Sequence, residues 1–192
     1  GEGLSDHPGI SKSRYHGRLL YETQVLVPWI MYRPGWQPER KSIAQEVRLL
    51  EVMPTLLDYL RIPAPDGIEG RSLMPLINGT ADEVPLPPYG VMETQFRDSD
   101  KIAVYGPEWK YIHSRRQHQG IATYELQARG LGNELGRRSN QLGEHPRAAQ
   151  EMRQYFQQWD EAHPRAQPTL TTEALPEQAR EQLEAIGYMG DD

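Results

Sequence analysis

GEGLSDHPGISKSRYHGRLLYETQVLVPWIMYRPG, residues 1–35, joins a polar, glycine-rich opening to a strongly apolar end. The run VLVPWIMY at residues 25–32 is rich in large apolar and β-branched side chains, a composition that predicts a buried strand. The polar residues 1–24 are expected to form a loop that carries the pair His16-Gly17. Polar groups beside a buried strand are typical of an α/β active site. Because no strand precedes this loop, we expect the chain to be the second part of a larger enzyme.

The next stretch predicts helices. Apolar residues recur at helical spacing over residues 42–60, and Pro54 predicts a short segment before it and a proline-started helix after it. The prolines of residues 61–88 indicate an extended surface connection.

A small antiparallel sheet is expected after this connection. Short strands are predicted at residues 89–95, 101–105, 109–113 and 122–126. Gly106-Pro107-Glu108 suits a tight hairpin between the second and third of these strands.

The remaining residues predict two helices. Pro146 suits the first turn of a helix over residues 146–159, whose apolar face carries Ala149, Met152, Phe156 and Trp159. Residues 164–172 are predicted to be a linker, and residues 175–186 an amphipathic helix that ends at Gly187. We therefore predict three parts, residues 1–87, 88–163 and 164–192.

Several motifs, taken together and in order, resemble the sulfatase family of the alkaline phosphatase superfamily. They are Gly1-Glu2-Gly3-Leu4, His16-Gly17, Leu20-Tyr21-Glu22, Val27-Pro28-Trp29-Ile30, MPTLLD at residues 53–58, IEGRSL at residues 68–73 and EQLEAIGY at residues 181–188. The resemblance implies an α/β fold, in which the C-terminal portion of an alkaline-phosphatase-like sandwich precedes a small antiparallel-sheet subdomain with a packed helix. It also implies an arylsulfatase-like parent enzyme that hydrolyses an organic sulfate ester.

The resemblance further implies a formylglycine nucleophile and a calcium ion. The family makes formylglycine from the Cys or Ser of a C/S-x-P-x-R motif, and this chain has no Cys and no Ser in that context. The family's acidic metal-binding pair would fall immediately upstream of Gly1. Asp6, in Ser5-Asp6-His7, imitates that pair and is the candidate ligand within the chain, with a solvated loop pair as the alternative. We therefore expect the chain alone to be inactive and its partner to be the missing N-terminal part of the same enzyme.

His16 is the candidate catalytic and substrate-binding residue. In the family, a Lys or His at this position contacts a substrate sulfate oxygen or the leaving group. An imidazole suits that role because it can donate a hydrogen bond or a proton near neutral pH. The alternative is a loop histidine that orients the backbone. Glu22 is expected to be a strand-entry residue rather than a catalytic carboxylate.

Other charged and aromatic residues have simpler interpretations. Lys12, Arg14 and Arg18 could attract an anionic substrate, although charged loop residues are usually only solvated. His113 and His118 flank a basic pair that could bind an anion, with a solvated hairpin tip as the alternative. The aromatic residues expected to form core contacts between sheet and helix are Trp109, Tyr111, Phe156 and Trp159.

Composition narrows the possible partners. The formal net charge of -6 argues against nucleic-acid binding, and no apolar stretch is long enough for a membrane span. The expected partner is a sulfated small molecule or glycan. Phosphate or phosphonate ester hydrolysis within the same superfamily and a non-catalytic binding module are the alternatives. The compartment stays open: periplasmic or extracellular if the parent carries a signal peptide, otherwise cytoplasmic. If the chain is a part of a larger enzyme, residues 25–32 should expose an apolar face.

Overall fold

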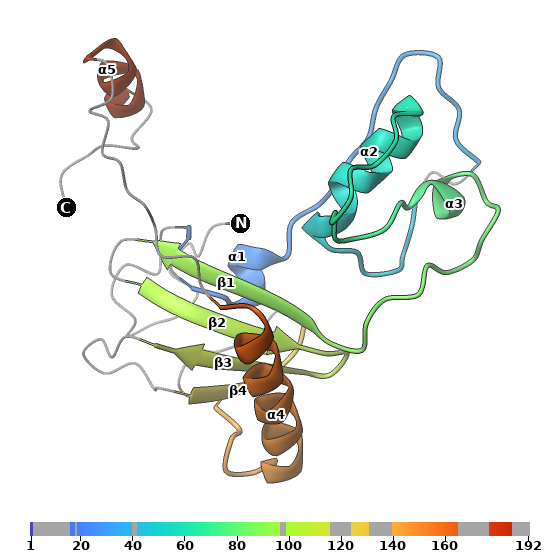
Figure 1. Ribbon diagram of the computed structural model, residues 1–192. Coiled ribbons are helices and arrows are strands. Elements are labelled where there is room, and N and C mark those ends of the chain that lie inside the picture. Colours follow the sequence, from blue (N-terminus) through green and yellow to red (C-terminus); the bar gives the residue numbers. More distant parts are fainter. Residues whose placement is uncertain are drawn as a thin grey trace. The chain divides into compact units, whose positions relative to one another are not determined.

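The computed structural model describes residues 1, 16–17, 19–39, 42–96, 99–115, 124–130, 140–164 and 177–185. It contains two compact units, Gly1–Phe156 and Gln157–Asp192. The described elements are, in chain order, α1 (Glu22–Val25), the 3-10 helix η1 (Leu49–Glu51), α2 (Val52–Leu60), α3 (Met74–Ile77), β1 (Gly90–Phe96), β2 (Ser99–Tyr105), β3 (Trp109–Ser114), β4 (Tyr124–Ala128), α4 (Pro146–Ala162) and α5 (Glu177–Ala185) (Figure 1).

The first unit is built on a four-stranded antiparallel sheet. Its strands lie side by side in the order β1-β2-β3-β4 (Figure 1). The turn at residues 106–108 closes the β2–β3 hairpin, in which the Gly106 N–H donates to the Trp109 carbonyl at 2.9 Å. The four predicted strands and the hairpin are confirmed, with strand ends that differ from the predicted ones by at most two residues.

One face of the sheet is apolar and packs against the first part of α4. Successive side chains of a strand point to opposite faces, so this face carries Ile102, Val104, Tyr111 and Leu126, all buried. From α4 the buried residues are Ala149, Met152 and Phe156. The predicted helix is therefore confirmed, and it continues to Ala162. The predicted fold class, α/β with an antiparallel sheet and a packed helix, is confirmed as well.

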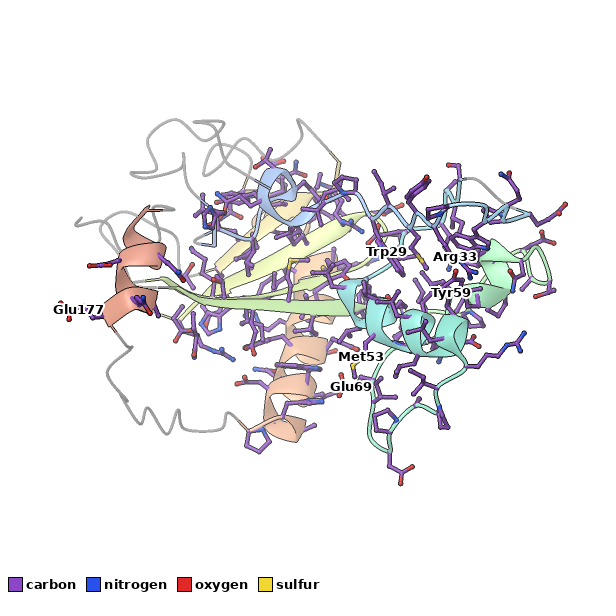
Figure 2. The ribbon with its side chains drawn as sticks, turned by 90° about the horizontal axis from the view of Figure 1, so that it is seen from above. Trp29, Arg33, Met53, Tyr59, Glu69 and Glu177 are labelled. Carbon is purple, nitrogen blue, oxygen red and sulfur yellow. The ribbon has the colours of Figure 1, made fainter. Side chains whose placement is uncertain are left out.

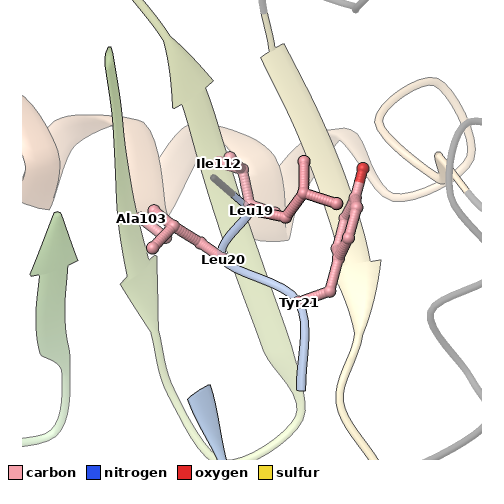
Figure 3. Packing of buried hydrophobic residues seen from close by; sticks show 5 residues of the cluster. All are labelled: Leu19, Leu20, Tyr21, Ala103 and Ile112. Atoms are coloured by element: carbon pink, nitrogen blue, oxygen red, sulfur yellow. The ribbon is translucent and has the colours of Figure 1, made fainter. Parts of the chain in front are cut away.

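The opposite face of the sheet is covered by residues 19–25. Leu19, Leu20 and Tyr21 form a buried cluster with Ala103 of β2 and Ile112 of β3 (Figure 3). Residues 22–25 form the single helical turn α1, so the predicted loop over residues 1–24 is wrong at its end.

The predicted strand at residues 25–32 is wrong. The chain leaves α1 after Val25 and has no regular element up to residue 39. None of the described strands pairs with this run, and an apolar segment without a hydrogen-bonded neighbour has no reason to stay extended and buried. Ile30 and Tyr32 are each 84% exposed, which confirms the predicted apolar exposure of this segment.

Residues 42–88 form a second, smaller core within the same unit. As predicted, a short segment (η1) precedes the helix, and Pro54 lies in the first turn of α2. The extended connection predicted for residues 61–88 is partly wrong, because α3 and its flanks bury Leu73, Leu76, Ile77 and Val84. Pro75 starts α3 instead of breaking it, since the first helical turn needs no N–H from proline.

The second unit contains α5, which lies within the predicted helix at residues 175–186. Gly187 and linker residues 165–172 are outside the described residues. No helix in the described part of the chain is both long enough and apolar enough to cross a membrane. The predicted division into three parts stays a prediction.

Candidate functional site

His16 lies at the exposed start of the segment that crosses the sheet. The following residue, Gly17, has a φ of 76°, a left-handed conformation that glycine adopts without strain. The Thr94 hydroxyl on β1 donates a hydrogen bond to the Gly17 carbonyl. The backbone next to His16 is therefore attached to β1, the edge strand of the described sheet, while the His16 side chain is exposed.

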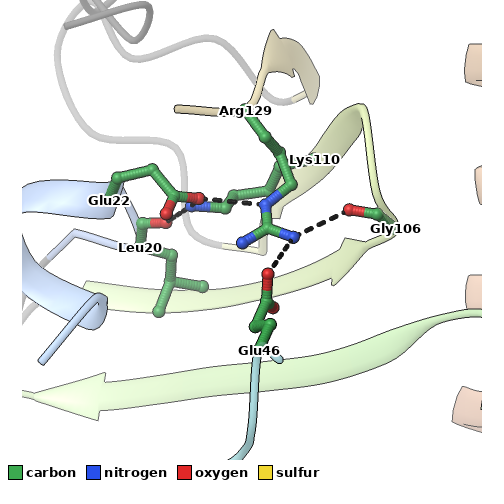
Figure 4. Close-up of polar contacts among 6 residues, drawn as sticks. All are labelled: Leu20, Glu22, Glu46, Gly106, Lys110 and Arg129. Atoms are coloured by element: carbon green, nitrogen blue, oxygen red, sulfur yellow. Dashed lines mark hydrogen bonds and ion pairs between the residues drawn. The ribbon is translucent and has the colours of Figure 1, made fainter. Parts of the chain in front are cut away.

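A buried ionic group fixes the rest of this segment to the sheet. Lys110 of β3 is fully buried, and its Nζ lies 2.8 Å from Glu22 Oε1 and donates to the Leu20 carbonyl at 2.8 Å (Figure 4). Arg129 Nε approaches the same Glu22 oxygen at 3.2 Å. Because buried charges are stable only when paired, this arrangement determines where residues 20–22 lie on the sheet.

Arg129 extends the group toward residues 46–48. Its Nη1 lies 2.9 Å from Glu46 Oε2 and donates to the Gly106 carbonyl at 2.9 Å (Figure 4). The guanidinium carbons of Arg129 and Arg48 lie 5.1 and 5.7 Å from the centre of the Tyr105 ring. We call Leu20, Glu22, Glu46, Gly106, Lys110 and Arg129 the Glu22 network.

The network keeps Glu22 ionised. Burial by itself raises the pKa of this carboxyl group, but hydrogen bonds and charge from Lys110 and Arg129 outweigh burial and hold the pKa below its ordinary value of 4.5. A carboxylate bound by two cations is a poor proton acceptor. The expectation that Glu22 is a strand-entry residue is therefore wrong. Glu22 is a buried anchor at the start of α1.

Further polar pairs lie on the same face of the sheet. The Tyr21 hydroxyl donates to Glu125 Oε2 at 2.7 Å, and Gln127 Nε2 donates to the same oxygen at 2.9 Å. Lys101 Nζ donates to Ser114 Oγ at 2.8 Å, and burial lowers the pKa of this lysine, partly offset by the charge of Glu125. Sequence reasoning missed these pairs. The only signal was the alternation of polar and apolar residues in strands that are buried on both faces.

The other histidine candidate has a packing role. The His113 ring stacks on Tyr124 at 4.6 Å between centroids and meets the edge of Phe156 at 5.3 Å. Nearby Arg115 is paired with carboxylates, at 3.7 Å from Glu93 and 3.8 Å from Asp100. These contacts favour neither the anion site nor the solvated hairpin tip. Asp6, Lys12, Arg14, Arg18 and His118 lie outside the described residues.

The predicted aromatic core is confirmed for Tyr111 and Phe156, which are buried. Trp109 is half-buried and packs on His145 with ring centroids 4.5 Å apart. Trp159 belongs to the second unit, where its ring stacks on His163 at 4.5 Å.

The described residues do not form a calcium site. No three His, Asp or Glu side chains in this part of the chain lie close enough together to hold a metal ion.

The family model for the C-terminal region of N-sulphoglucosamine sulphohydrolase matches residues 11–130, more than half of the chain. The matched range contains His16, the segment over the sheet and all four strands. The chain therefore belongs to this sulfatase family, and the resemblance inferred from the motifs is confirmed.

Curated relatives agree with this assignment. An arylsulfatase of Clostridium perfringens (strain 13 / Type A) is 36% identical over 80 residues, which are 40% of this chain and 16% of the relative. Arylsulfatase K of Homo sapiens is 26% identical over 124 residues, 64% of this chain and 20% of the relative. The chain thus matches about a fifth or less of the length of these relatives.

Two solved structures are also similar. One is a 2-O GAG sulfatase, with a TM-score of 0.44 and 22% identity over 58% of this chain and 24% of that chain. The other was solved with its substrate D-glucosamine-2-N,6-O-disulfate, and has a TM-score of 0.45 and 17% identity over 58% of this chain and 23% of that chain.

Proposed function

We propose that the chain is the C-terminal part of an arylsulfatase-like enzyme that hydrolyses an organic sulfate ester, on a sulfated small molecule or glycan. The observation that carries the proposal is the sulfohydrolase family match over residues 11–130. The arylsulfatase relatives are several times longer than the matched region, which supports a larger parent enzyme.

His16 is the substrate contact in this proposal. Its side chain is exposed, and the backbone beside it is attached to β1 through Thr94 and Gly17. An imidazole N–H at this position can donate a hydrogen bond to a sulfate oxygen or a proton to the leaving oxygen. The Glu22 network supports the role because it attaches residues 20–22, which follow His16 in the chain, to the sheet.

The nucleophile and the metal are assigned to the rest of the parent enzyme. The chain has no Cys and no Ser in a C/S-x-P-x-R context, and its described residues offer no metal site. The chain alone is therefore expected to be inactive. Formylglycine and calcium, where present in the parent, would supply the attacking oxygen and part of the charge stabilisation.

An exposed apolar stripe supports packing against that remaining part. Leu49, Met53, Leu56 and Leu60 recur at helical spacing over η1 and α2, and all are exposed. Met53 is visible on the outer side of α2 in Figure 2. Large exposed apolar patches usually mark contact surfaces, and we assign this one to the N-terminal part of the parent.

The proposal is tested on the complete parent protein. Aryl sulfate, aryl phosphate and aryl phosphonate esters are compared as substrates. A sulfatase should show the highest kcat/KM on the sulfate, whereas a preference for phosphate or phosphonate would replace this function with the alternative one.

The role of His16 is tested separately with His16→Ala. Loss of a hydrogen-bond or proton donor at the reacting group should lower kcat/KM by about 10²-fold or more. His163→Ala, at an exposed position in the second unit, is the matched control and should keep full activity. If both variants keep full activity, His16 has no catalytic role even where the parent is a sulfatase.

A further inference from the structure

A hollow of about 370 Å³ lies where the β2–β3 hairpin meets the start of α4. We call it the acidic aromatic hollow, and its lining residues are Tyr89, Gly106, Pro107, Glu108, Trp109, Ala148, Glu151 and Met152. Neither His16 nor Thr94, whose hydroxyl binds the Gly17 carbonyl beside His16, lines this hollow.

Tyr89 is held as one wall of the hollow. Its ring packs on Tyr155 with centroids 4.9 Å apart, and its hydroxyl donates to Glu151 Oε1. That hydrogen bond, together with burial, raises the pKa of Tyr89 to about 12, so the phenol stays neutral. A Cβ at Gly106 would lie 3.0 Å from the Tyr89 ring, which shows how closely the hairpin approaches this wall.

Trp109 forms a second aromatic wall. It is half-buried, and its ring rests on His145 at 4.5 Å between centroids. Both aromatic walls are therefore fixed by neighbours, and a ligand would meet them without first ordering them.

The charge of the lining is negative. Glu108 and Glu151 are exposed, and none of the lining residues is Lys, Arg or His. Two cations lie close by in the structure, but both are paired: Arg129, which donates to the Gly106 carbonyl, contacts Glu22 and Glu46, and Lys110 of β3 contacts Glu22.

We propose that the acidic aromatic hollow binds an alkylammonium group between Tyr89 and Trp109, with Glu108 and Glu151 as its counter-ions. Aromatic faces and carboxylates both attract a cation, and a methylated ammonium also has an apolar surface that these rings can cover. An anion such as sulfate would be repelled here. The hollow is therefore a site distinct in chemistry from the sulfate-binding role proposed for His16.

The test is a titration of the 192-residue chain with choline. Binding is monitored by NMR, from the chemical shifts of the tryptophan indole N–H groups. Trp109→Phe identifies the resonance of Trp109. Sodium chloride at equal ionic strength and 3,3-dimethyl-1-butanol, the neutral analogue of choline, are the ligand controls. Because the hollow is open, we expect binding on the order of a millimolar dissociation constant, with shifts at Trp109 that neither control produces.

Two charge variants decide the assignment. Glu151→Gln and Glu108→Gln should each weaken choline binding by about two- to fivefold, as expected for loss of one exposed charge contact. Glu69→Gln removes an equal charge at an exposed position outside the hollow (Figure 2) and should leave binding unchanged. Equal shifts from the neutral analogue, shifts only at other tryptophans, or equal losses in all three variants would each overturn the proposal.

Discussion

Replacing Glu22 by Leu should destabilise the chain by about 3–5 kcal/mol, the usual cost of leaving a buried charge without its partner. The structure indicates which charge is affected. Lys110 is fully buried and would lose its ion pair with Glu22, whereas Arg129 is partly exposed and would keep its contacts with Glu46 and Gly106. Most of the cost therefore comes from Lys110.

This reasoning predicts a strong coupling between Glu22 and Lys110. If Lys110→Met is added to Glu22→Leu, the buried charge that lost its ion pair with Glu22 disappears as well, and apolar replacements of buried ion pairs are often close to neutral. The double variant should therefore be more stable than Glu22→Leu alone, by about 2 kcal/mol or more.

The measurement is urea unfolding of the 192-residue chain followed by circular dichroism. Exposed Glu69→Leu serves as the control and should change the free energy of unfolding by less than about 0.5 kcal/mol. A loss below about 1 kcal/mol for Glu22→Leu, or additive effects in the double variant, would refute the view that the Glu22 network anchors residues 20–22.

Two further predictions follow from the same unit. The pKa of Glu22 lies below its ordinary value of 4.5 in the folded chain, so its contribution to stability should be complete above about pH 4.5 and be lost as the pH falls through the folded pKa. In urea unfolding from about pH 6 to about pH 3, the difference in the free energy of unfolding between wild type and Glu22→Leu should therefore decrease. A difference that stays constant would contradict the pKa shift. Gly70→Ala should destabilise more than Gly67→Ala in the same assay, because both residues have positive φ but only a Cβ at Gly70 meets backbone, 2.2 Å from the Leu50 carbonyl oxygen. The strain shared by the two positions is about 1–2 kcal/mol, and equal losses would show that the approach of Leu50 does not matter.

The sheet and α4 could be predicted from the sequence because their signals are local. Strand composition, the Gly106-Pro107 turn and the helical spacing of Ala149, Met152 and Phe156 each act over a few residues. Local signals of this kind need no knowledge of distant neighbours.

The errors arose where the outcome depends on distant contacts. Residues 25–32 have the composition of a strand, but strand formation needs a pairing partner, and none of the described strands provides one. The prolines of residues 61–88 favour an extended connection when taken by composition alone, but Pro75 lies in the first turn of α3, where proline is also favoured.

The candidate site was even harder to predict from the sequence. Glu22, Lys110 and Arg129 are separated by up to 107 positions, and no spacing rule connects them. His16 could be proposed only through the family resemblance, since an isolated loop histidine has no diagnostic pattern of its own.

The burial of Lys110 also constrains how β3 can pair with its neighbours. Lys110 and Tyr111 are adjacent, and they point to opposite faces of a sheet that is covered on both sides. A slip of β3 by one residue would turn the lysine toward the face that packs against α4 and the tyrosine toward the face covered by residues 19–25. An all-apolar strand would tolerate such a slip more easily. The buried ion pair of Lys110 therefore favours a single register of β3 in the β2–β3 hairpin over registers shifted by one residue.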